Sequence, residues 1–330
     1  MKRQILHLAA AFACAGTALA QTVSVKSPDG KNEIRLSTEP TLSYSVYRGG
    51  IERVSPSPIA LEIEGVGTLG GAGAKIATAD TVSVKGTIDT PIYKKARVDE
   101  SANRTTVTFE GGWGIVLVAR NDGVAYRFTT SLPGRVKVLN EVASLGLPDA
   151  MATVFAGYCR NNKGDPLQCS WESIYTTPNA AGVAAGGQTV YLPLVVKHGD
   201  GVVMCVTESD LLDYPGWNLK RAEGDAPALV ANMAKYPAKT KHWDWKIKDV
   251  PPDRPLRQIK VVERADYLAE TAGTRTYPWR VFMLAPTESK LCEADIVYAL
   301  ATPCKLKKTD WIKPGKVAWD WWNCWNVSGV

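Results

Sequence analysis

Apolar and polar residues alternate along most of this chain with the period of two that is typical of half-buried β-strands. The alternation is regular at residues 42–48 and 59–65, and further strands are predicted at 105–109, 114–119 and 123–129. Gly-Gly, Asp-Gly and Asn-Asp-Gly sequences separate these segments, and such residues favour tight turns. Helical periodicity is nearly absent over the first 284 residues. The pattern therefore predicts an all-β fold, a sandwich of many short strands.

Two segments depart from the strand pattern and are predicted to be short helices. Residues 208–212 follow a Thr and carry acidic side chains, as the first turn of a helix does. Residues 289–301 place four apolar side chains on roughly one helical face. The small-residue segment 180–188 is expected to be a loop. Residues 70–75 (GGAGAK) lack the ending of a phosphate-binding loop and are expected to form a turn between strands.

The end of the chain has a different composition. Residues 304–316 are polar, contain a Pro-Gly turn and form the expected linker, after which residues 317–330 are predicted to open a second domain with a strand.

Tryptophan is costly to expose, and a flat indole suits the apolar face of a sugar ring. Five tryptophans cluster near the end of the chain, and they predict a sugar-binding surface that is incomplete within these 330 residues. Its members are Trp311, Trp319, Trp321, Trp322 and Trp325.

The first 20 residues have the pattern of a cleavable secretion signal. Lys2 and Arg3 precede an apolar stretch, and Ala18-Leu19-Ala20 resembles a cleavage site, so the mature chain is expected to begin at Gln21. The apolar stretch is short for a membrane span, and no later segment reaches about 18 uninterrupted apolar residues. The sequence thus predicts a secreted or periplasmic protein without a membrane span.

Charge and cysteine content narrow the possible partners. The net charge of +6 falls to +4 once Lys2 and Arg3 leave with the signal, and no lysine- or arginine-rich block suggests nucleic-acid binding. Export permits disulfides, and Cys159 with Cys169, which flank a turn-rich loop, is the first pair to test against the alternative of free cysteines. With three histidines and no Cys-x-x-Cys beside them, a zinc site is not expected.

Several charged residues have two interpretations. Glu208, Asp210 and Asp213 form an acidic cluster that suits either a sugar or cation site or, as favoured here, charges at a helix start. Arg127 and Arg280 follow aromatic residues in predicted strands and are expected to pack within the sandwich.

His198 precedes a Gly-Asp-Gly turn and is expected to be exposed, and His242 lies in a polar, aromatic loop with no partner at metal-ligand spacing. These contexts argue against a mutarotase-like epimerase, which needs a positioned acid–base pair.

Six segments, in order along the chain, resemble the N-terminal part of glycoside hydrolase family 97, the exported α-glucosidases and α-galactosidases. The last is long and specific. The segments are SPDGKNEIRL (27–36), DGVAYRF (122–128), WESIYT (171–176), VTESDLLDYPGWNL (206–219), YPWRVFML (277–284) and DWIKPGKVAWDWWN (310–323).

The resemblance implies an architecture. Residues 21–303 would form a β-super-sandwich similar to galactose mutarotase, residues 304–316 a linker, and residues 317–330 the first strand of a truncated (β/α)8 barrel. The catalytic carboxylates would come from later barrel strands, so no catalytic residue is assigned within this chain. At the C-terminal end of the first barrel strand, Asp320, Trp322 and Asn323 would contact the oligosaccharide substrate.

The resemblance also implies a calcium ion beside the substrate. Its ligand from this domain would be Glu172, the acid of the Trp-Glu-x-x-Tyr motif. Because calcium takes about six to eight oxygen ligands, Glu172 alone would not hold it, and the 330-residue chain would bind calcium weakly or not at all. From the residues alone, Glu172 would be an ordinary solvated loop carboxylate.

These features give one main hypothesis and one alternative. The first is the N-terminal part of a calcium-dependent α-glycosidase, and the 330-residue chain made alone is expected to be poorly soluble or inactive because its tryptophan cluster is partly bare. The alternative is a non-catalytic carbohydrate-binding or interaction module. Substrate sugar, retaining or inverting outcome, and oligomeric state stay open.

Overall fold

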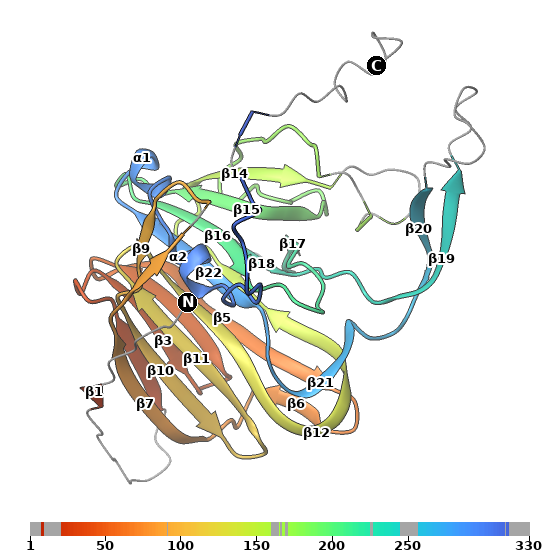
Figure 1. Cartoon of the computed structure of the whole chain (residues 1–330), viewed down its shortest axis with the longest axis horizontal. Helices are drawn as coiled ribbons and strands as arrows, with labels where there is room; N and C mark the ends of the chain where they lie inside the picture. Colours follow the sequence, from red (N-terminus) through yellow and green to blue (C-terminus); the bar gives the residue numbers. More distant parts are fainter. Residues whose placement is uncertain are drawn as a thin grey trace.

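A computed structural model describes residues 8–9, 21–90, 92–159, 165, 167–168, 171–224, 227–244, 257–313 and 315–316. Within these ranges the chain is almost entirely β, which confirms the all-β prediction (Figure 1). The first strands are β2 (Thr22–Lys26), β3 (Asn32–Ser37), β4 (Ser43–Arg48), β5 (Ile51–Ile63), β6 (Gly67–Gly70), β7 (Ile76–Val84), β8 (Thr87–Asp89), β9 (Arg97–Asp99), β10 (Ala102–Phe109), β11 (Trp113–Arg120) and β12 (Gly123–Ala143). Those that follow are β13 (Leu145–Gly146), β14 (Thr153–Tyr158), β15 (Val190–Lys197), β16 (Val203–Ser209), β17 (Leu219–Arg221), β18 (Ala228–Ala231), β19 (Pro237–Asp244), β20 (Arg257–Arg264), β21 (Ala269–Thr276) and β22 (Trp279–Ala285).

The strands form two antiparallel layers that face each other across one core. One layer has the order β7–β10–β11–β12–β22–β16–β15–β14. The other contains β2, β3, β4 and β5, and its strands β2 and β3 lie over β10 and β11 (Figure 1). The apolar positions of the alternating pattern fill the space between the layers, including the fully buried Ile34, Leu36, Leu117 and Phe282.

The long strand β12 joins the two layers. Its first part pairs with β11 and β22, and its last part pairs with β21 and β5. The pairings then close on themselves, running from β5 through β12, β22, β16, β15, β17, β18 and β13 back to β5. A ring of this kind leaves no free edge among its members, which removes sites for unwanted strand pairing.

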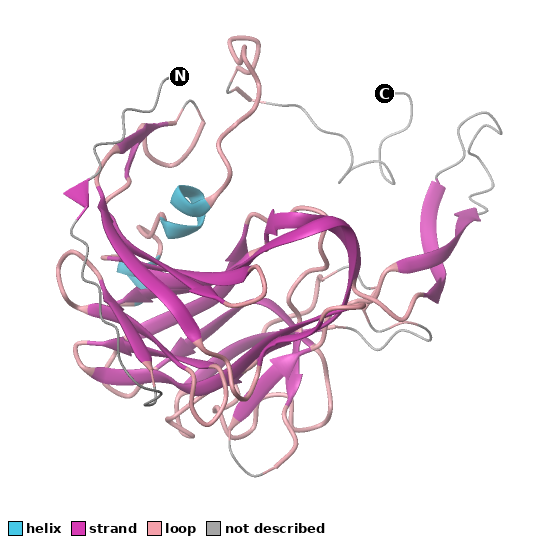
Figure 2. Ribbon diagram, turned by 90° about the horizontal axis from the view of Figure 1, so that it is seen from below, coloured by secondary structure: helices cyan, strands magenta, loops and turns pink. Residues whose placement is uncertain are grey.

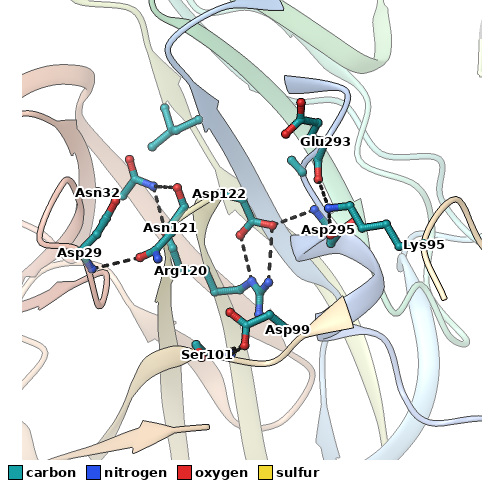
Figure 3. Close-up of polar contacts among 12 residues, drawn as sticks. Asp29, Asn32, Lys95, Asp99, Ser101, Arg120, Asn121, Asp122, Glu293 and Asp295 are labelled. Carbon is teal, nitrogen blue, oxygen red and sulfur yellow. Dashed lines mark hydrogen bonds and ion pairs between the residues drawn. The ribbon is translucent and has the colours of Figure 1, made fainter. Parts of the chain in front are cut away.

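Two of the sequence segments meet at one end of the sandwich. The buried side chain of Asn32 donates hydrogen bonds to the backbone oxygens of Arg120 and Asn121, at 2.9 and 3.1 Å (Figure 3). The Asp29 N–H donates to Asn121 Oδ1 at 3.0 Å. Asp122 accepts from Arg120 Nε at 2.9 Å and from the Asp295 N–H at 2.7 Å. Because buried polar groups need partners, this network fixes the β2–β3 and β11–β12 turns together.

The predicted helix over 289–301 is two short helices, α1 (Glu288–Leu291) and α2 (Ile296–Leu300). Between the two helices, Lys94 Nζ donates hydrogen bonds to the carbonyl oxygens of Cys292 and Ala294, at 2.6 and 2.7 Å. Lys95 Nζ donates to the carbonyl oxygen of Glu293 at 2.7 Å. These lysines, from the loop between β8 and β9, bind the carbonyls that a continuous helix would use, and the helix is interrupted there.

The predicted helix over 208–212 is wrong. Residues up to Ser209 belong to β16 and pair with β22, and Asp210 and Asp213 adopt left-handed backbone angles, with φ of 61° and 48°. Cross-strand pairing therefore prevailed over the acidic pattern of a helix start. Residues 180–188 form turns and 70–75 lie in a turn, as predicted.

Strands β19 and β20 form a two-stranded ribbon that projects from the sandwich (Figures 1 and 2). They pair only with each other among the described strands.

The two ends of the chain are only partly described. Leu8 and Ala9 form a short strand, β1, that pairs with β7, and the rest of the predicted signal lies outside the described residues. Residues 304–313 contain no helix or strand. The predicted second-domain strand, with Asp320, Trp322 and Asn323, lies outside the described residues. None of the helices within the described ranges has the length and apolar character needed to span a membrane.

Candidate functional site

Three of the sequence segments converge where β16, β22 and the loop before β15 meet. Strands β16 and β22 pair so that Glu208 lies directly opposite Arg280. The loop containing Trp171 and Glu172 reaches the same place, since Trp171, Glu208 and Trp217 line one cavity. Leu167 and Ala234, which are 67 positions apart in the chain, line this same cavity, so distant segments form a single surface.

A buried ion cluster supports this surface. The Arg280 guanidinium donates to both oxygens of Glu141, with Nη2 at 2.8 Å from each, and Nη1 donates to Glu208 Oε2 at 2.8 Å. The backbone N–H of Trp217 donates to the same Glu208 carboxylate at 3.1 Å. Arg280 is 1% exposed, so one guanidinium bridges two carboxylates away from solvent. The prediction that Arg280 packs within the sandwich is confirmed, and Glu208 is its ion-pair partner rather than a helix-start charge.

Burial raises the pKa of the Glu208 carboxyl above its ordinary value of 4.5, and the facing Arg280 and the Trp217 N–H offset part of this rise. A carboxyl whose pKa is raised by folding stabilises the fold below its unfolded pKa, and this contribution is lost as the pH rises through the folded pKa. Replacing Glu208 by Gln should therefore change the free energy of unfolding in a pH-dependent way. Over the pH interval that begins at the unfolded pKa of 4.5, the free energy of unfolding of the variant should increase relative to that of the native protein as the pH rises.

Urea denaturation of Glu208→Gln and the native protein across this pH interval measures the difference directly. Loss of the ion pair with Arg280 adds a constant offset, so the slope of the difference against pH is the informative quantity. A difference that does not change with pH would contradict the proposed ionisation of Glu208.

The loop that carries the Trp-Glu-x-x-Tyr motif is held by its neighbours. Ser173 Oγ donates to the Tyr158 carbonyl oxygen at 2.5 Å, and Tyr191 Oη donates to the Ser173 carbonyl oxygen at 3.1 Å. Tyr175 Oη donates to the Pro193 carbonyl oxygen at 3.2 Å. Loop atoms fixed by hydrogen bonds to adjacent strands present their side chains in a defined direction.

Trp171 and Glu172 lie at the start of this loop. Glu172 is exposed, and Trp171 is 41% exposed with its indole packed edge-on against Tyr191, at 5.6 Å between ring centroids. Trp171 has a φ of 57°, a left-handed conformation that costs a non-glycine residue about 1–3 kcal/mol. Gly157 makes room for Tyr191, because a Cβ at that position would lie 2.4 Å from the Tyr191 ring.

The cavity beside Trp171 has a volume of about 330 Å³. Aromatic side chains form much of its wall, and Glu208 and Asn218 supply polar groups. Asn218 is 8% exposed. The residues that line the cavity are Leu167, Trp171, Tyr191, Leu192, Glu208, Pro215, Gly216, Trp217, Asn218 and Ala234.

Other predicted residues have varied outcomes. Asp210 accepts hydrogen bonds from Thr302 and pairs with Arg127 at 3.5 Å, and the Arg127 guanidinium stacks over Trp279 at 4.2 Å, so Arg127 packs as predicted. His198, expected to be exposed, is buried, because Asp200 in its turn pairs with the buried Arg53 and draws the turn onto β5. Burial lowers the pKa of the His198 imidazole.

The cysteine and metal predictions are tested only in part. Cys169 lies outside the described residues, so its pairing with Cys159 stays a prediction. Cys205, Cys292 and Cys304 form no disulfide within the described part of the chain. That part also contains no group of three or more histidine, cysteine, aspartate or glutamate residues arranged to hold a metal ion.

Comparisons with known proteins give consistent results. The sequence model named Glycosyl-hydrolase 97 N-terminal matches residues 25–303. A retaining α-galactosidase of Bacteroides thetaiotaomicron is 34% identical over 311 residues, covering 93% of this chain and 45% of the relative. A probable retaining α-galactosidase of Streptomyces bingchenggensis is 23% identical over 308 residues, covering 91% of this chain and 41% of the relative. The chain therefore spans less than half the length of these curated relatives.

Solved structures show the same fold. A glycoside hydrolase family 97 enzyme from Pseudoalteromonas sp. strain K8, in complex with acarbose, has a TM-score of 0.71 and 22% identity, covering 89% of this chain and 40% of that one. A variant of a Pseudoalteromonas sp. strain K8 family 97 enzyme in complex with panose has the same TM-score and coverage. A β-arabinopyranosidase structure has a TM-score of 0.63 at 18% identity, covering 80% of this chain and 40% of that one.

Proposed function

Because the chain belongs to glycoside hydrolase family 97, we propose that it is the N-terminal part of an exported, calcium-dependent α-glycosidase that removes terminal α-linked sugars from oligosaccharides. The observation that carries the proposal is the family match over residues 25–303. The 34% identity to a retaining α-galactosidase favours α-galactosides over α-glucosides as substrates, with retention at the anomeric carbon.

A retaining glycosidase uses two carboxyl groups about 5–5.5 Å apart. One protonates the leaving oxygen, and the other attacks the anomeric carbon to form a glycosyl-enzyme that water then hydrolyses. We assign neither role within this chain. In this proposal both come from a (β/α)8 barrel that begins with residues 317–330, where Asp320, Trp322 and Asn323 contact the sugar. The preceding domain is then a galactose-mutarotase-like super-sandwich, and the signal at residues 1–20 directs the protein to the periplasm or beyond.

Glu172 is the ligand that this domain would offer to calcium. Its carboxylate is exposed on a loop fixed by Ser173, Tyr175 and Tyr191, and a carboxylate oxygen is the donor that a hard cation prefers. Because calcium takes about six to eight oxygen ligands, the other oxygens would in this proposal come from outside this domain. When bound, calcium would supply positive charge that orients the sugar hydroxyls and offsets the nearby carboxylates.

The test is an assay of the product encoded by the complete reading frame on aryl α-galactosides and aryl α-glucosides, before and after removal of calcium by a chelator. We expect cleavage of the galactoside, loss of activity with the chelator, and recovery when calcium is returned. The 330-residue chain alone should be inactive. Cleavage by this chain alone, or full activity without calcium, would contradict the proposal.

A non-catalytic carbohydrate-binding module is the second candidate, and the aromatic cavity beside Trp171 favours it. A complete reading frame that ends at Val330, with sugar binding but no hydrolysis, would support this second function.

A further inference from the structure

We propose that the cavity beside Trp171 is a binding subsite for one neutral pyranose unit, separate from the calcium ligand Glu172. The inference takes its ligand class from the proposed function and adds a sugar contact that this domain makes with its own residues. It rests on three features of the cavity: its aromatic walls, its fixed polar groups and the backbone of Trp171.

The size and walls of the cavity fit a single sugar ring. A volume of about 330 Å³ lies at the small end of the range of about 300–1,000 Å³ for small-molecule sites. Trp171, Tyr191 and Trp217 line the cavity. The rings of Trp171 and Tyr191 are nearly perpendicular, with 79° between their planes. Aromatic faces cover the C–H groups of a pyranose without requiring hydrogen bonds, because those groups are apolar.

The polar groups of the cavity are oriented before any ligand arrives. The Glu208 carboxylate accepts hydrogen bonds from Arg280 Nη1 and from the backbone N–H of Trp217, and its side chain is 16% exposed. A carboxylate has about four lone-pair positions, so Glu208 keeps capacity for sugar hydroxyls. Asn218 also lines the cavity and brings an amide donor and acceptor to its wall.

The backbone of Trp171 supports the same conclusion. An indole that only filled space would not require the left-handed φ of 57°, which costs free energy for any residue with a Cβ. The hydrogen bonds of Ser173 and Tyr191 hold the loop and maintain this conformation. Strain that surrounding contacts maintain is a feature of ligand-binding positions.

The charge of the cluster sets the class of sugar. Glu141 and Glu208 carry two negative charges against the single positive charge of Arg280, so the cavity wall has an excess negative charge. A sugar acid would place a third carboxylate against this wall and be repelled. Neutral hexoses avoid this repulsion while offering neighbouring hydroxyls to Glu208 and Asn218.

Ligand-observed NMR titration of the 330-residue chain tests the subsite with methyl α-galactoside, methyl α-glucoside and galacturonate at pH 7. We expect dissociation constants on the order of 1 mM for the two neutral glycosides and at least tenfold weaker binding of galacturonate. Trp171→Gly tolerates the left-handed backbone and removes the ring, and it should weaken binding of the neutral sugars at least tenfold. Trp171→Phe should restore most of it.

Ile174→Ala is the matched control, since Ile174 lies on the same loop, is 88% exposed and does not line the cavity. Its affinity should stay within twofold of the native value. In the product of the complete reading frame, Trp171→Gly should raise KM for oligosaccharides more than KM for aryl glycosides. Unchanged affinity and KM in Trp171→Gly would overturn the subsite, as would equal binding of galacturonate.

The outcomes separate the subsite from the proposed function. Hydrolysis of aryl α-galactosides with no effect of Trp171→Gly on either readout would leave the function standing and remove the subsite. Trp171-dependent sugar binding without any glycosidase activity would do the reverse.

Discussion

Replacing Glu172 by Gln in the product of the complete reading frame is expected to lower kcat/KM on aryl α-galactosides at least a hundredfold. The amide keeps the size of the side chain but removes the negative charge that a calcium ion would bind. Mutation of residues that only orient metal ligands changes metal affinity or activity by about 10–100-fold. Mutation of a direct ligand should therefore have at least that effect. A hundredfold loss corresponds to about 2.7 kcal/mol of transition-state stabilisation.

Steady-state kinetics at increasing calcium concentration checks this expectation. If Glu172 binds the ion, the variant should need more calcium for half-maximal activity and should recover part of its rate when calcium is high. Ile174→Ala, two residues along the same loop, controls for general disturbance and should keep its activity within twofold. Native kinetics and native calcium dependence in Glu172→Gln would remove Glu172 from the metal site.

Replacing Arg280 by Ala is expected to lower the free energy of unfolding by about 3–5 kcal/mol. The substitution leaves Glu141 and Glu208 facing each other without the guanidinium that bridges them, and Arg280 is too deeply buried for water to take its place. A typical domain is stable by only about 5–15 kcal/mol, so this single change removes a large part of the total.

Urea denaturation of the native and variant proteins measures the loss. Arg135→Ala is the control, because Arg135 also pairs with a glutamate, Glu270, but on the surface, where such a pair contributes about 0–1 kcal/mol. Where Arg280→Ala does not fold, Arg280→Lys keeps one charge and still reports the loss of the two-sided contact. A change in Arg280→Ala no larger than that in Arg135→Ala would show that the cluster contributes little.

The strands were predictable because each one carries its own signal. Alternation and turn residues identified β3, β4 and the start of β12 from short windows of sequence, and an apolar run between turn residues identified the fully buried β11. Short edge elements such as β8 and β9, with few apolar residues, gave no comparable signal.

The helices and the cavity depended on contacts between distant parts of the chain. The acidic segment after Thr207 locally has the pattern of a helix start. It forms a strand because Arg280, more than 70 positions later, pairs with Glu208 across the sheet. Likewise, Lys94 and Lys95 interrupt the helix that residues 289–301 favour locally. The family motif pointed to Glu172. The proposed role of Trp171 rests on its backbone angle and its neighbours Tyr191 and Trp217, which sequence spacing does not bring together.

The closure of the strand ring has a consequence for biosynthesis. Strand β12 is complete once Ala143 has been made, yet β22, which pairs with its first part, ends at Ala285. At about 5–20 residues per second, the ribosome needs roughly 7–28 s to add those intervening residues. During that interval the nascent β12 has an unpaired edge, so ring closure waits for nearly the whole domain to emerge. A polypeptide released before residue 285 would therefore lack the final strand and depend on chaperones that hold unpaired strands apart.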